Sequence, residues 1–455
     1  MWLRNRWPGL LAIALFLCLA RPACAENLTG DIVWSGLVEL DETVEIFPEA
    51  VLTVKPGTRI KITNPLAKIS VRGVLRVDGS KTAPVVFDSP SGWEGIEFMQ
   101  AANGSRLSGV RIQGAKAAVS SFATNFDVDN STFRDCEAGI KPLRESAPVI
   151  TDSTFENNQI GLVNEMKSGA VVRGNRFIGH HKTAILTSHG STGEITGNHF
   201  EKNKQGIAVL QKFLGRIAKN RFVANETGIY CNQSQSTPLI ENNRFESNTY
   251  AMINFSFAYP VVKGNVFVDN EMAVRNDQYG SPLLQNNLFG KNQTALYNYR
   301  KSNPRVRKNQ FEQNQRAIFC DFSSYPEIKQ NNFIDNVMAV ELGIYQSADW
   351  EKRSGSKTIM QREALNRQSQ NPLLAQAPTE FRDEVDVSEN WWGDQTVLLD
   401  KAGQDGNVTI FHDRRDQPKV TYEGYGSESY RIDRVKFAPW LKQPVEEAGP
   451  EGDHE

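Results

Sequence analysis

Cysteine is scarce in this sequence, with five residues among 455. Cys18 and Cys24 fall within a leader that we expect to be removed, which leaves Cys136, Cys231 and Cys320. These three lack the paired spacing of a zinc site, and so few cysteines exclude a fold held together by disulfides. We expect free, buried thiols, which is the usual state of a cysteine in a protein core.

A basic excess is also absent, because 51 lysines and arginines face 53 aspartates and glutamates. Removal of the leader takes away three arginines and no acid, so the mature net charge is near −5. This balance excludes a general nucleic-acid binder. The sequence also shows no Gly-rich phosphate loop and no Ser-His-Asp set.

No apolar run is long enough to cross a membrane. The run Leu10–Leu19 follows two arginines and precedes Ala23-Cys24-Ala25, an order typical of a secretory signal peptide. We therefore predict export by a cleavable signal at residues 1–25. In a diderm bacterium the destination is the periplasm or the outside of the cell.

A phenylalanine recurs at near-constant spacing through the middle of the chain, at every 22 or 23 residues. The ten members are Phe133, Phe155, Phe177, Phe200, Phe222, Phe245, Phe267, Phe289, Phe311 and Phe333. Such a fixed period is typical of a solenoid, in which each repeat forms one coil stacked on the next.

Other residues keep a fixed offset from this phenylalanine. Asn stands two residues before it, from Asn175 to Asn331, and three residues after it, from Asn158 to Asn336. Gly or Ala stands at plus six, an apolar residue follows, and Pro often stands seven before. Asn tolerates the left-handed backbone of a sharp bend, and Pro opens a strand without breaking a ladder. We expect three short strands per coil, stacked rings inside and Asn amides hydrogen-bonded along the axis.

The leucine-rich repeat is the main alternative, because its period range includes 22 residues. That repeat requires several leucines and a helical segment, whereas these repeats are rich in Asn, Gly and Pro. We therefore predict an all-β fold, a right-handed parallel β-helix solenoid with coils about 4.8 Å apart. A partly helical insertion and a C-terminal β cap complete it.

Four features carry a resemblance to a known family: the Asn-x-Phe register, the runs Val51–Thr58 and Gly92–Phe98, and the closing run Asn390–Gly393. Together they resemble the right-handed β-helix repeats of the pectate-lyase-like superfamily, in its carbohydrate-binding and sugar-hydrolase branch (NosD-like). The resemblance covers about residues 30–345 and 385–440. It implies the fold and says little of function, because one fold hosts many functions. No catalytic signature of pectate lyases or polygalacturonases carries over.

We divide the chain into six parts. They are a signal peptide at 1–25, starting coils at 26–110, regular coils at 111–344, a polar insertion at 345–384, a final coil and cap at 385–442, and a disordered acidic tail at 443–455. In the final coil Trp392 takes the position of the repeated phenylalanine.

The later coils are rich in aromatic residues about ten to fourteen positions after the phenylalanine. Loops on a rigid scaffold commonly carry function, and a column of rings at a regular step suits the flat faces of sugars. We predict carbohydrate-binding residues at Phe255, Tyr279, Tyr299, Phe322 and Tyr325. The alternative to a sugar-binding column is that alternate rings point inward and form a second core stack. For Tyr297 and Phe319 we favour this position in the core.

Asp277 and Asp321 share one repeat position two coils apart, with Tyr299 between them. The strand spacing separates them by about 9.6 Å, close to the separation in inverting glycosidases. They are weak candidates for catalysis, because solenoids often place charges at equivalent outer positions. Arg275, Arg300 and Lys301 lie near them in sequence and suit an acidic sugar or a lyase base.

Two further clusters, one of basic residues and one of histidines, are expected to have a structural role and not to bind a ligand. The basic residues Lys182, Lys202, Lys204, Lys212, Arg216, Lys219 and Arg221 suit a solvated face, with an anionic glycan as the alternative. The histidines His180, His181, His189 and His199 fall on different sides of the repeat, whereas a metal needs converging ligands. We predict no metal and no cofactor.

The leading hypothesis is an exported, non-catalytic β-helix that binds a polysaccharide or envelope glycan along its aromatic side. A polysaccharide-active lyase, hydrolase or epimerase is the first alternative. An envelope scaffold or adhesin that binds a protein partner is the second. No nucleic acid and no membrane span is expected.

Overall fold

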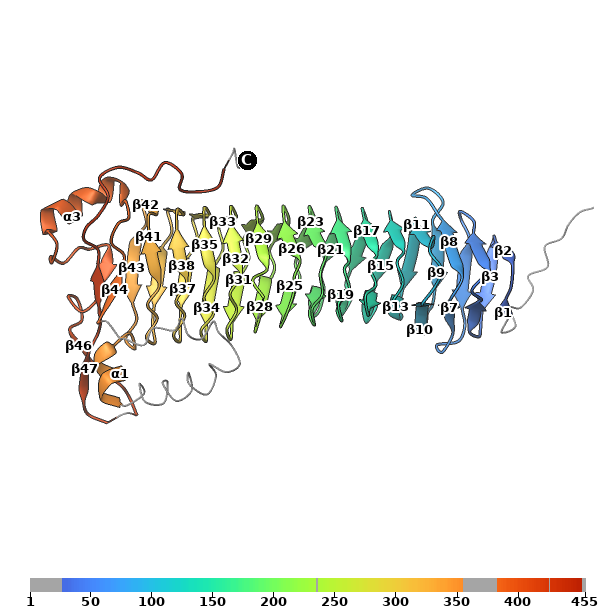
Figure 1. Ribbon diagram of the computed structural model, residues 1–455, viewed down its shortest axis with the longest axis horizontal. Helices are drawn as coiled ribbons and strands as arrows, with labels where there is room; N and C mark the ends of the chain where they lie inside the picture. The colour runs from blue at the N-terminus through green and yellow to red at the C-terminus, as the bar shows by residue number, and fades with distance from the viewer. Residues whose placement is uncertain (1–26, 235, 355–382, 425, 452–455) are drawn as a thin grey trace, which may run out of the picture.

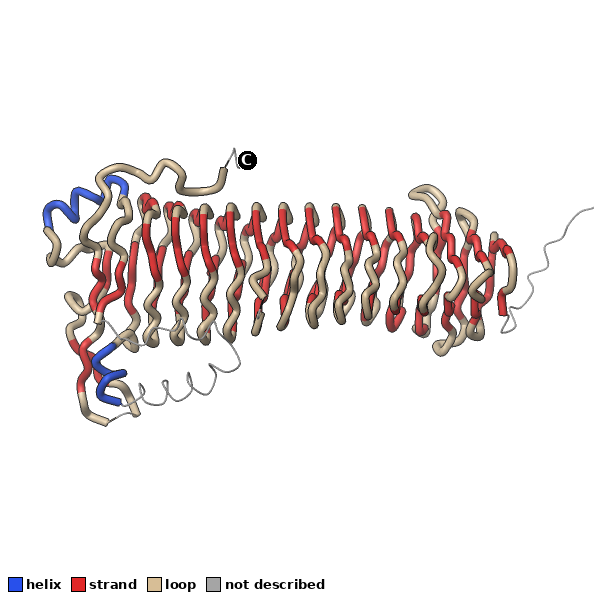
Figure 2. Tube along the Cα trace, in the orientation of Figure 1, coloured by secondary structure: helices blue, strands red, loops and turns tan. Residues whose placement is uncertain are grey.

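The computed structural model describes residues 27–234, 236–354, 383–424 and 426–451. In these ranges the chain forms an elongated parallel β-helix, in which successive coils add one strand to each of three sheets (Figure 1, Figure 2). The predicted all-β solenoid with coils of about 22 residues is confirmed. The predicted signal peptide and residues 355–382 of the predicted insertion lie outside the described residues. Within these ranges, no helix is long and apolar enough to span a membrane.

The first sheet has 16 parallel strands, and its outer face carries the candidate site. In spatial order the strands are β1 (Asn27–Leu28), β4 (Val44–Ile46), β7 (Lys68–Val71), β10 (Trp93–Met99), β13 (Ala115–Phe122), β16 (Ala138–Leu143), β19 (Ile160–Asn164), β22 (Thr183–Thr187), β25 (Gln205–Leu210), β28 (Thr227–Asn232), β31 (Tyr250–Phe255), β34 (Met272–Asp277), β37 (Thr294–Asn298), β40 (Arg316–Cys320), β43 (Met338–Leu342) and β45 (Phe411–His412). Up to β43, each gap in the numbering marks the passage through the other two sheets.

The second sheet has 14 parallel strands, several of which begin directly after a proline. They are β2 (Asp31–Trp34), β5 (Val51–Val54), β8 (Val74–Asp78), β11 (Arg106–Ser108), β14 (Asp127–Asp129), β17 (Val149–Thr151), β20 (Val171–Arg173), β23 (Glu194–Thr196), β26 (Arg216–Ala218), β29 (Leu239–Glu241), β32 (Val261–Lys263), β35 (Leu283–Gln285), β38 (Arg305–Arg307) and β41 (Glu327–Lys329). The carbonyl of Pro238 still accepts the N–H of Val261 on the next coil, so proline opens the strand without harm to the ladder.

The third sheet also has 14 strands and holds the repeated phenylalanines. They are β3 (Leu37–Leu40), β6 (Arg59–Ile62), β9 (Val85–Asp88), β12 (Val110–Gln113), β15 (Thr132–Arg134), β18 (Thr154–Glu156), β21 (Arg176–Ile178), β24 (His199–Glu201), β27 (Arg221–Val223), β30 (Arg244–Glu246), β33 (Val266–Val268), β36 (Leu288–Gly290), β39 (Gln310–Glu312) and β42 (Asn332–Ile334). The phenylalanines pair with each other in register, so each ring lies over the ring of the preceding coil.

The phenylalanine rings form one continuous stack inside the solenoid. Neighbouring ring centroids lie 4.7 to 5.0 Å apart, and all ten side chains are fully buried. Trp392 extends the stack, with its ring 4.5 Å from that of Phe333, as the sequence predicts. Burial of each ring contributes roughly 1.5–3 kcal/mol, so this stack is a principal source of stability.

Two rows of buried asparagines run parallel to the ring stack. Asn198 is representative: its side-chain N–H donates to the Val172 carbonyl at 3.0 Å and to Asn220 Oδ1 at 3.0 Å. The backbone N–H of Asn198 also donates to Asn220 Oδ1, at 2.9 Å. The predicted hydrogen bonding of Asn amides along the axis is therefore confirmed. Every member satisfies backbone groups at a bend, which is why a buried polar row is tolerated there.

His180 takes the place of an asparagine in the row three residues after the phenylalanine. Its Nδ1 lies 2.8 Å from Asn203 Oδ1, and its Nε2 lies 3.4 Å from Asn158 Nδ2. These partners assign the proton to Nδ1, which donates, and leave Nε2 to accept. Burial lowers the pKa of His180 to about 4, so the ring is neutral at pH 7.

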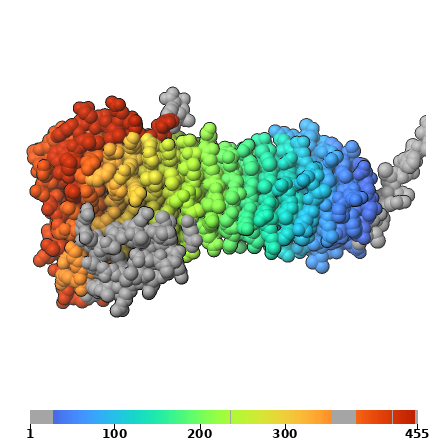
Figure 3. Space-filling view, viewed as in Figure 1, coloured from blue at the N-terminus to red at the C-terminus, as the bar shows by residue number. Residues whose placement is uncertain are grey.

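Short elements cover the C-terminal end of the solenoid (Figure 1, Figure 3). They are α1 (Ala348–Ser354), β44 (Glu384–Asp386), the 3-10 helix η2 (Gly393–Gln395), α3 (Thr396–Ala402), β46 (Lys419–Thr421), β47 (Ser429–Arg431) and β48 (Arg434–Lys436). β44 pairs with β48 in parallel, and β46 pairs with β47 in antiparallel fashion. These pairs continue beyond the last coil, where an open solenoid end would otherwise expose strand edges.

The segment after the cap differs from the prediction of a disordered tail. Residues 443–451 run back along the outside of the solenoid. Asn332 forms two hydrogen bonds with the backbone of Val445, at 2.9 and 3.0 Å, and the N–H of Gly449 donates to the Lys308 carbonyl. Lys308 also pairs with Glu447. The acidic composition was therefore misleading for this stretch, because side-chain amides on the coils fix its backbone.

Candidate functional site

The outer face of the first sheet is defined by the alternation along each strand. On β37, Leu296 belongs to the core and Asn298 is fully buried, while Tyr297 between them points outward. The residues in register with Tyr297 form an outer row of Glu97, Ser120, Lys141, Val163, Leu186, Ala208, Tyr230, Ile253, Arg275, Phe319 and Glu341. The charged members confirm that this row faces away from the core.

Rings gather on this outer face over the later coils. We call the following six side chains the aromatic face: Tyr230, Tyr250, Phe255, Tyr297, Tyr299 and Phe322. All six are half-exposed. Tyr299 lies 5.7 Å from Tyr297 and 4.9 Å from Phe322, measured between ring centroids. The rings thus form a partly open surface and not a sealed second core.

Arginines are interleaved with these rings. The Arg275 guanidinium lies 5.9 Å from the Tyr250 ring centroid and 5.6 Å from that of Tyr297. Arg300 lies 5.2 Å from the ring centroid of Tyr299. A guanidinium within about 6 Å of a ring face is attracted by the ring quadrupole. The stacking holds two charged groups in fixed positions at the surface.

Asp277 anchors both arginines. Arg275 donates to Asp277 Oδ2 at 3.0 Å, and Arg300 donates to both oxygens, at 2.6 and 2.8 Å. The Asp277 side chain is only 2 % exposed. A buried carboxylate whose two oxygens are bound by guanidinium groups serves as an anchor and is unsuited to proton transfer.

Asp321 lies two coils further along at the same repeat position, as the sequence predicts, but in different surroundings. Its Oδ1 accepts the backbone N–H of Phe322 at 2.9 Å, and its carboxyl group packs against Gly343. Burial raises the pKa of Asp321 to about 6. The two carboxylates therefore differ in environment, and only Asp321 resembles a carboxyl group that can exchange a proton near neutral pH.

The five predicted carbohydrate contacts fall into two groups. Phe255, Tyr299 and Phe322 belong to the aromatic face. Tyr279 instead stacks on Phe257 at the adjacent bend, with centroids 4.9 Å apart. The Tyr325 hydroxyl donates to Asp433 Oδ2 at 2.8 Å, so Tyr325 faces the cap.

The assignment of Tyr297 and Phe319 to the core is wrong. Their rings stack on each other with centroids 4.7 Å apart, but they do so on the outer face of the sheet. Phe319 is 8 % exposed because the Arg316 guanidinium lies 4.6 Å above its ring. Sequence reasoning also missed Tyr230 and Tyr250. The available signal was position plus eight after the phenylalanine, where Tyr230 and Tyr297 both stand.

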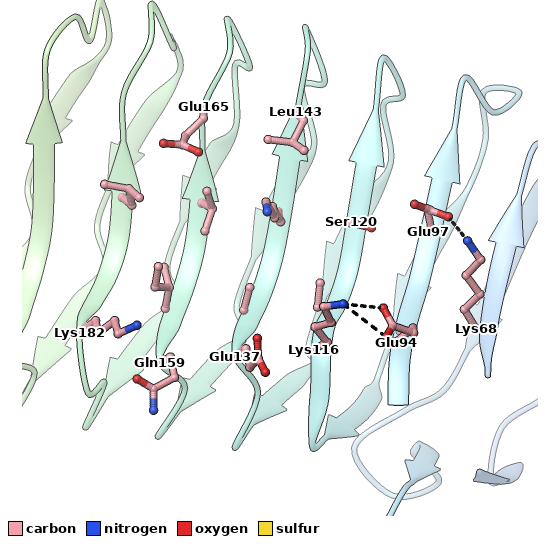
Figure 4. A pocket seen from close by; sticks show the side chains of 17 residues that line it. Lys68, Glu94, Glu97, Lys116, Ser120, Glu137, Leu143, Gln159, Glu165 and Lys182 are labelled. Carbon is pink, nitrogen blue, oxygen red and sulfur yellow. Dashed lines mark hydrogen bonds and ion pairs between the residues drawn. The ribbon is translucent and has the colours of Figure 1, made fainter. Parts of the chain in front are cut away.

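A polar groove lies on the same outer face over β7 to β22 (Figure 4). Its volume is about 810 Å³, and Lys68, Lys116, Lys141 and Lys182 line it together with glutamates and glutamine. Two of the lysines are paired, since Lys68 lies 2.7 Å from Glu97 and Lys116 lies 3.2 Å from Glu94. Leu143, Val163 and Leu186 contribute an apolar floor.

The polar groove and the aromatic face belong to one continuous surface. Leu186 of the groove is in register with Ala208, and Ala208 is in register with Tyr230. From β10 to β43 the surface crosses eleven strand spacings of about 4.8 Å, roughly 53 Å in all. A ligand that uses the whole surface must be a polymer.

The remaining clusters are held within the scaffold. Arg216 pairs with Glu241, and Arg221 pairs with Glu246, which leaves a mixed-charge face. His199 lies 3.3 Å from Glu201, and His189 bonds Ser188 at 2.7 Å. The three described cysteines are free and buried.

The described residues do not fit a copper centre. Copper favours clustered His, Cys and Met ligands. His180 is fixed in the asparagine row, and the buried Cys231 and Cys320 lie four coils apart, with Asn254, Asn276 and Asn298 between them in register. No group of three His, Cys, Asp or Glu side chains able to hold a metal ion is present in the ranges that the structure describes.

Two family models match the sequence. Residues 85–257 match the family described as periplasmic copper-binding protein (NosD), and residues 216–350 match the right handed beta helix region. A search of curated proteins found no match. The sheet topology and these two matches make this chain a right-handed parallel β-helix protein.

Three solved structures are similar to this chain. The first is a tailspike protein mutant of E. coli bacteriophage HK620 in complex with a pentasaccharide, with 11 % identity, a TM-score of 0.38 and coverage of 69 % of both chains. The second is the catalytic unit of a GH87 alpha-1,3-glucanase from Streptomyces thermodiastaticus, with 10 % identity, a TM-score of 0.34 and coverage of 68 % of this chain and 62 % of that chain. The third is a mutant of the periplasmic alginate epimerase AlgG, with 12 % identity, a TM-score of 0.32 and coverage of 68 % of this chain and 77 % of that chain.

Proposed function

We propose that this protein is exported through a cleavable signal at residues 1–25 and binds a polysaccharide or envelope glycan without cutting it. The binding surface is the outer face of the first sheet, with the aromatic face at its centre. The match to a family described as periplasmic supports export. The observation that carries the binding proposal is the set of half-exposed rings interleaved with anchored arginines on one regular surface.

The surface suits a linear polymer that lies along the solenoid axis. Each coil presents the same outer positions at a repeat of about 4.8 Å, so successive sugar residues meet successive rings and polar groups. Tyr297 and Tyr299 are partly exposed rings with outward hydroxyl groups, and guanidinium donors lie beside them. The polar groove extends the same surface toward the N-terminus.

Non-catalytic binding is favoured because Asp277 is committed to two arginines. A hydrolase of the inverting type requires two carboxyl groups that share the scissile bond. Of the two candidate aspartates, Asp321, whose pKa burial raises to about 6, is the one that no arginine is shown to hold among the described residues. Because the pKa of Asp321 is raised, a polysaccharide-active enzyme with Asp321 as the general acid is the second candidate function.

The test is affinity electrophoresis of the purified protein beside two variants. In the double variant Tyr297→Ala with Tyr299→Ala, loss of two ring contacts is expected to raise the Kd for the retained polysaccharide about tenfold or more. Trp34→Ala is the control, because Trp34 is a half-exposed ring in the second sheet, away from this surface. Equal retention of the double variant and the wild type would refute the aromatic face as the binding surface.

A further inference from the structure

We propose that the aromatic face selects an anionic sugar residue, and that Arg275 and Arg300, preset by Asp277, form the anion-binding clamp. This inference rests on the proposed glycan binding and names its ligand class. The ligand group is a carboxylate or a sulfate ester carried on a sugar ring.

The charges of the clamp do not cancel. Two guanidinium groups share the one carboxylate of Asp277, which leaves an excess of one positive charge at the surface. The neighbouring Arg316 is paired with Glu341 at 2.9 Å and adds no further excess, while Asp321 lies on the next coil near Tyr299. The three side chains of the clamp together carry one positive charge, on a protein whose overall charge is negative.

Donor groups of the clamp remain available. Arg275 uses Nη2 toward Asp277, while Arg300 uses Nε and Nη2. Toward the residues that the structure describes, these two guanidinium groups make no further hydrogen bond, so their remaining N–H groups are left for a ligand, and the two side chains are 31 % and 41 % exposed. Planar carboxylate and sulfate groups accept paired hydrogen bonds from such N–H groups.

The clamp is rigid before any ligand arrives. Tyr250 and Tyr297 lie against the Arg275 guanidinium, and Tyr299 lies against that of Arg300. Asp277 fixes both groups from below. Since the side chains are already ordered, binding does not incur the full rotamer cost of two arginines. A sugar ring stacked on Tyr299 would hold its acidic substituent beside the clamp.

The test compares polymers that share a backbone and differ in charge. Carboxymethyl cellulose is compared with hydroxyethyl cellulose, and dextran sulfate with dextran, in affinity gels at fixed ionic strength. The wild type is expected to bind at least one acidic polymer about tenfold more tightly than its neutral counterpart. Which of the two acidic polymers is retained decides between a carboxylate and a sulfate.

Two variants separate the clamp from general charge attraction. Arg300→Gln is expected to reduce the preference for the acidic polymer about tenfold, because the affinity for the acidic polymer falls more than the affinity for its neutral counterpart. Arg221→Gln removes the same charge from the third sheet, where Arg221 pairs with Glu246, and is expected to leave the preference intact. Circular dichroism of each variant establishes that the fold is retained.

The outcomes are distinguishable. Equal binding of acidic and neutral polymers would overturn the clamp and leave glycan binding standing. An acidic preference that Arg221→Gln lowers as much as Arg300→Gln would also overturn the clamp. Retention of none of the four polymers would overturn the clamp and count against glycan binding itself.

Discussion

Replacement of His180 by asparagine is expected to make the protein less sensitive to acid. His180 occupies a rung that asparagine fills in the neighbouring coils, and its ring must stay neutral to donate from Nδ1 and accept at Nε2. Burial lowers its pKa from 6.5 to about 4. In the unfolded chain the same ring gains its proton near pH 6.5, so the unfolded state is favoured as the pH falls from 6.5 to 4.

The magnitude follows from that difference in pKa. A shift of one unit corresponds to about 1.4 kcal/mol, so the wild type loses about 3 kcal/mol of its free energy of unfolding through this group between pH 7.5 and pH 4. The contribution is fully present above pH 6.5 and is lost as the pH falls. His180→Asn lacks the titrating ring but is expected to keep the hydrogen bonds of the row. In the next coil the Asn203 amide N–H donates to the Phe177 carbonyl and to Asn225 Oδ1, and an asparagine at position 180 can make the equivalent bonds.

The assay is urea unfolding of the wild type and His180→Asn at a series of pH values from 7.5 to 4. The quantity of interest is the difference in free energy of unfolding between the two proteins, because every other titrating group cancels in it. The difference is expected to move in favour of the variant by about 2 kcal/mol at pH 5 and about 3 kcal/mol at pH 4. His181→Asn serves as the control. A difference that does not change with pH would refute the role given to His180.

Three further predictions concern the core and the site. Phe245→Ala removes one ring from the middle of the stack and is expected to lower the free energy of unfolding by about 3–5 kcal/mol in urea titration, and an effect below about 1 kcal/mol would contradict a close-packed stack. Burial raises the pKa of Cys136 to about 11 and that of Cys320 to about 12. A thiol reagent is therefore expected to label none of the three buried cysteines at pH 8 until denaturant is added, and rapid labelling of the native protein would be contrary evidence. Burial raises the pKa of Asp321 to about 6, so its contribution to stability is present below pH 3.8 and falls as the pH rises to 6. The free energy of unfolding of Asp321→Asn relative to the wild type is therefore expected to rise over that range by up to about 3 kcal/mol, and a constant difference would argue against burial as the cause.

The sequence predicts the coil architecture because the same physical demand recurs in every repeat. One buried ring, one or two asparagines at bends and a small residue at plus six are required in each coil, so the period is visible without knowledge of the fold. Trp392 follows the same rule at the last position, where it stacks on Phe333. His180 stands three residues after Phe177, which is the position of an asparagine in the neighbouring coils.

The face of each outer residue is harder to predict. Ala295 and Leu296 are adjacent in sequence and both fully buried, so the alternation of inward and outward positions breaks between them. Counting in steps of two from Phe289 therefore places Tyr297 in the core, whereas it lies on the outer face. The sequence does indicate that Arg275 and Arg300 suit an acidic sugar, but it does not predict their pairing with Asp277, since the Arg300–Asp277 pair joins residues from different coils.

We propose that the outer face of the first sheet binds glycan and does not cut it. The most direct test is native affinity electrophoresis of the purified protein through gels cast with neutral and acidic polysaccharides, incubated until any cleared zones would develop. We expect retardation without clearing, and loss of that retardation in the variant that lacks the Tyr297 and Tyr299 rings. Clearing of the gel, or free migration through every polysaccharide, would contradict it.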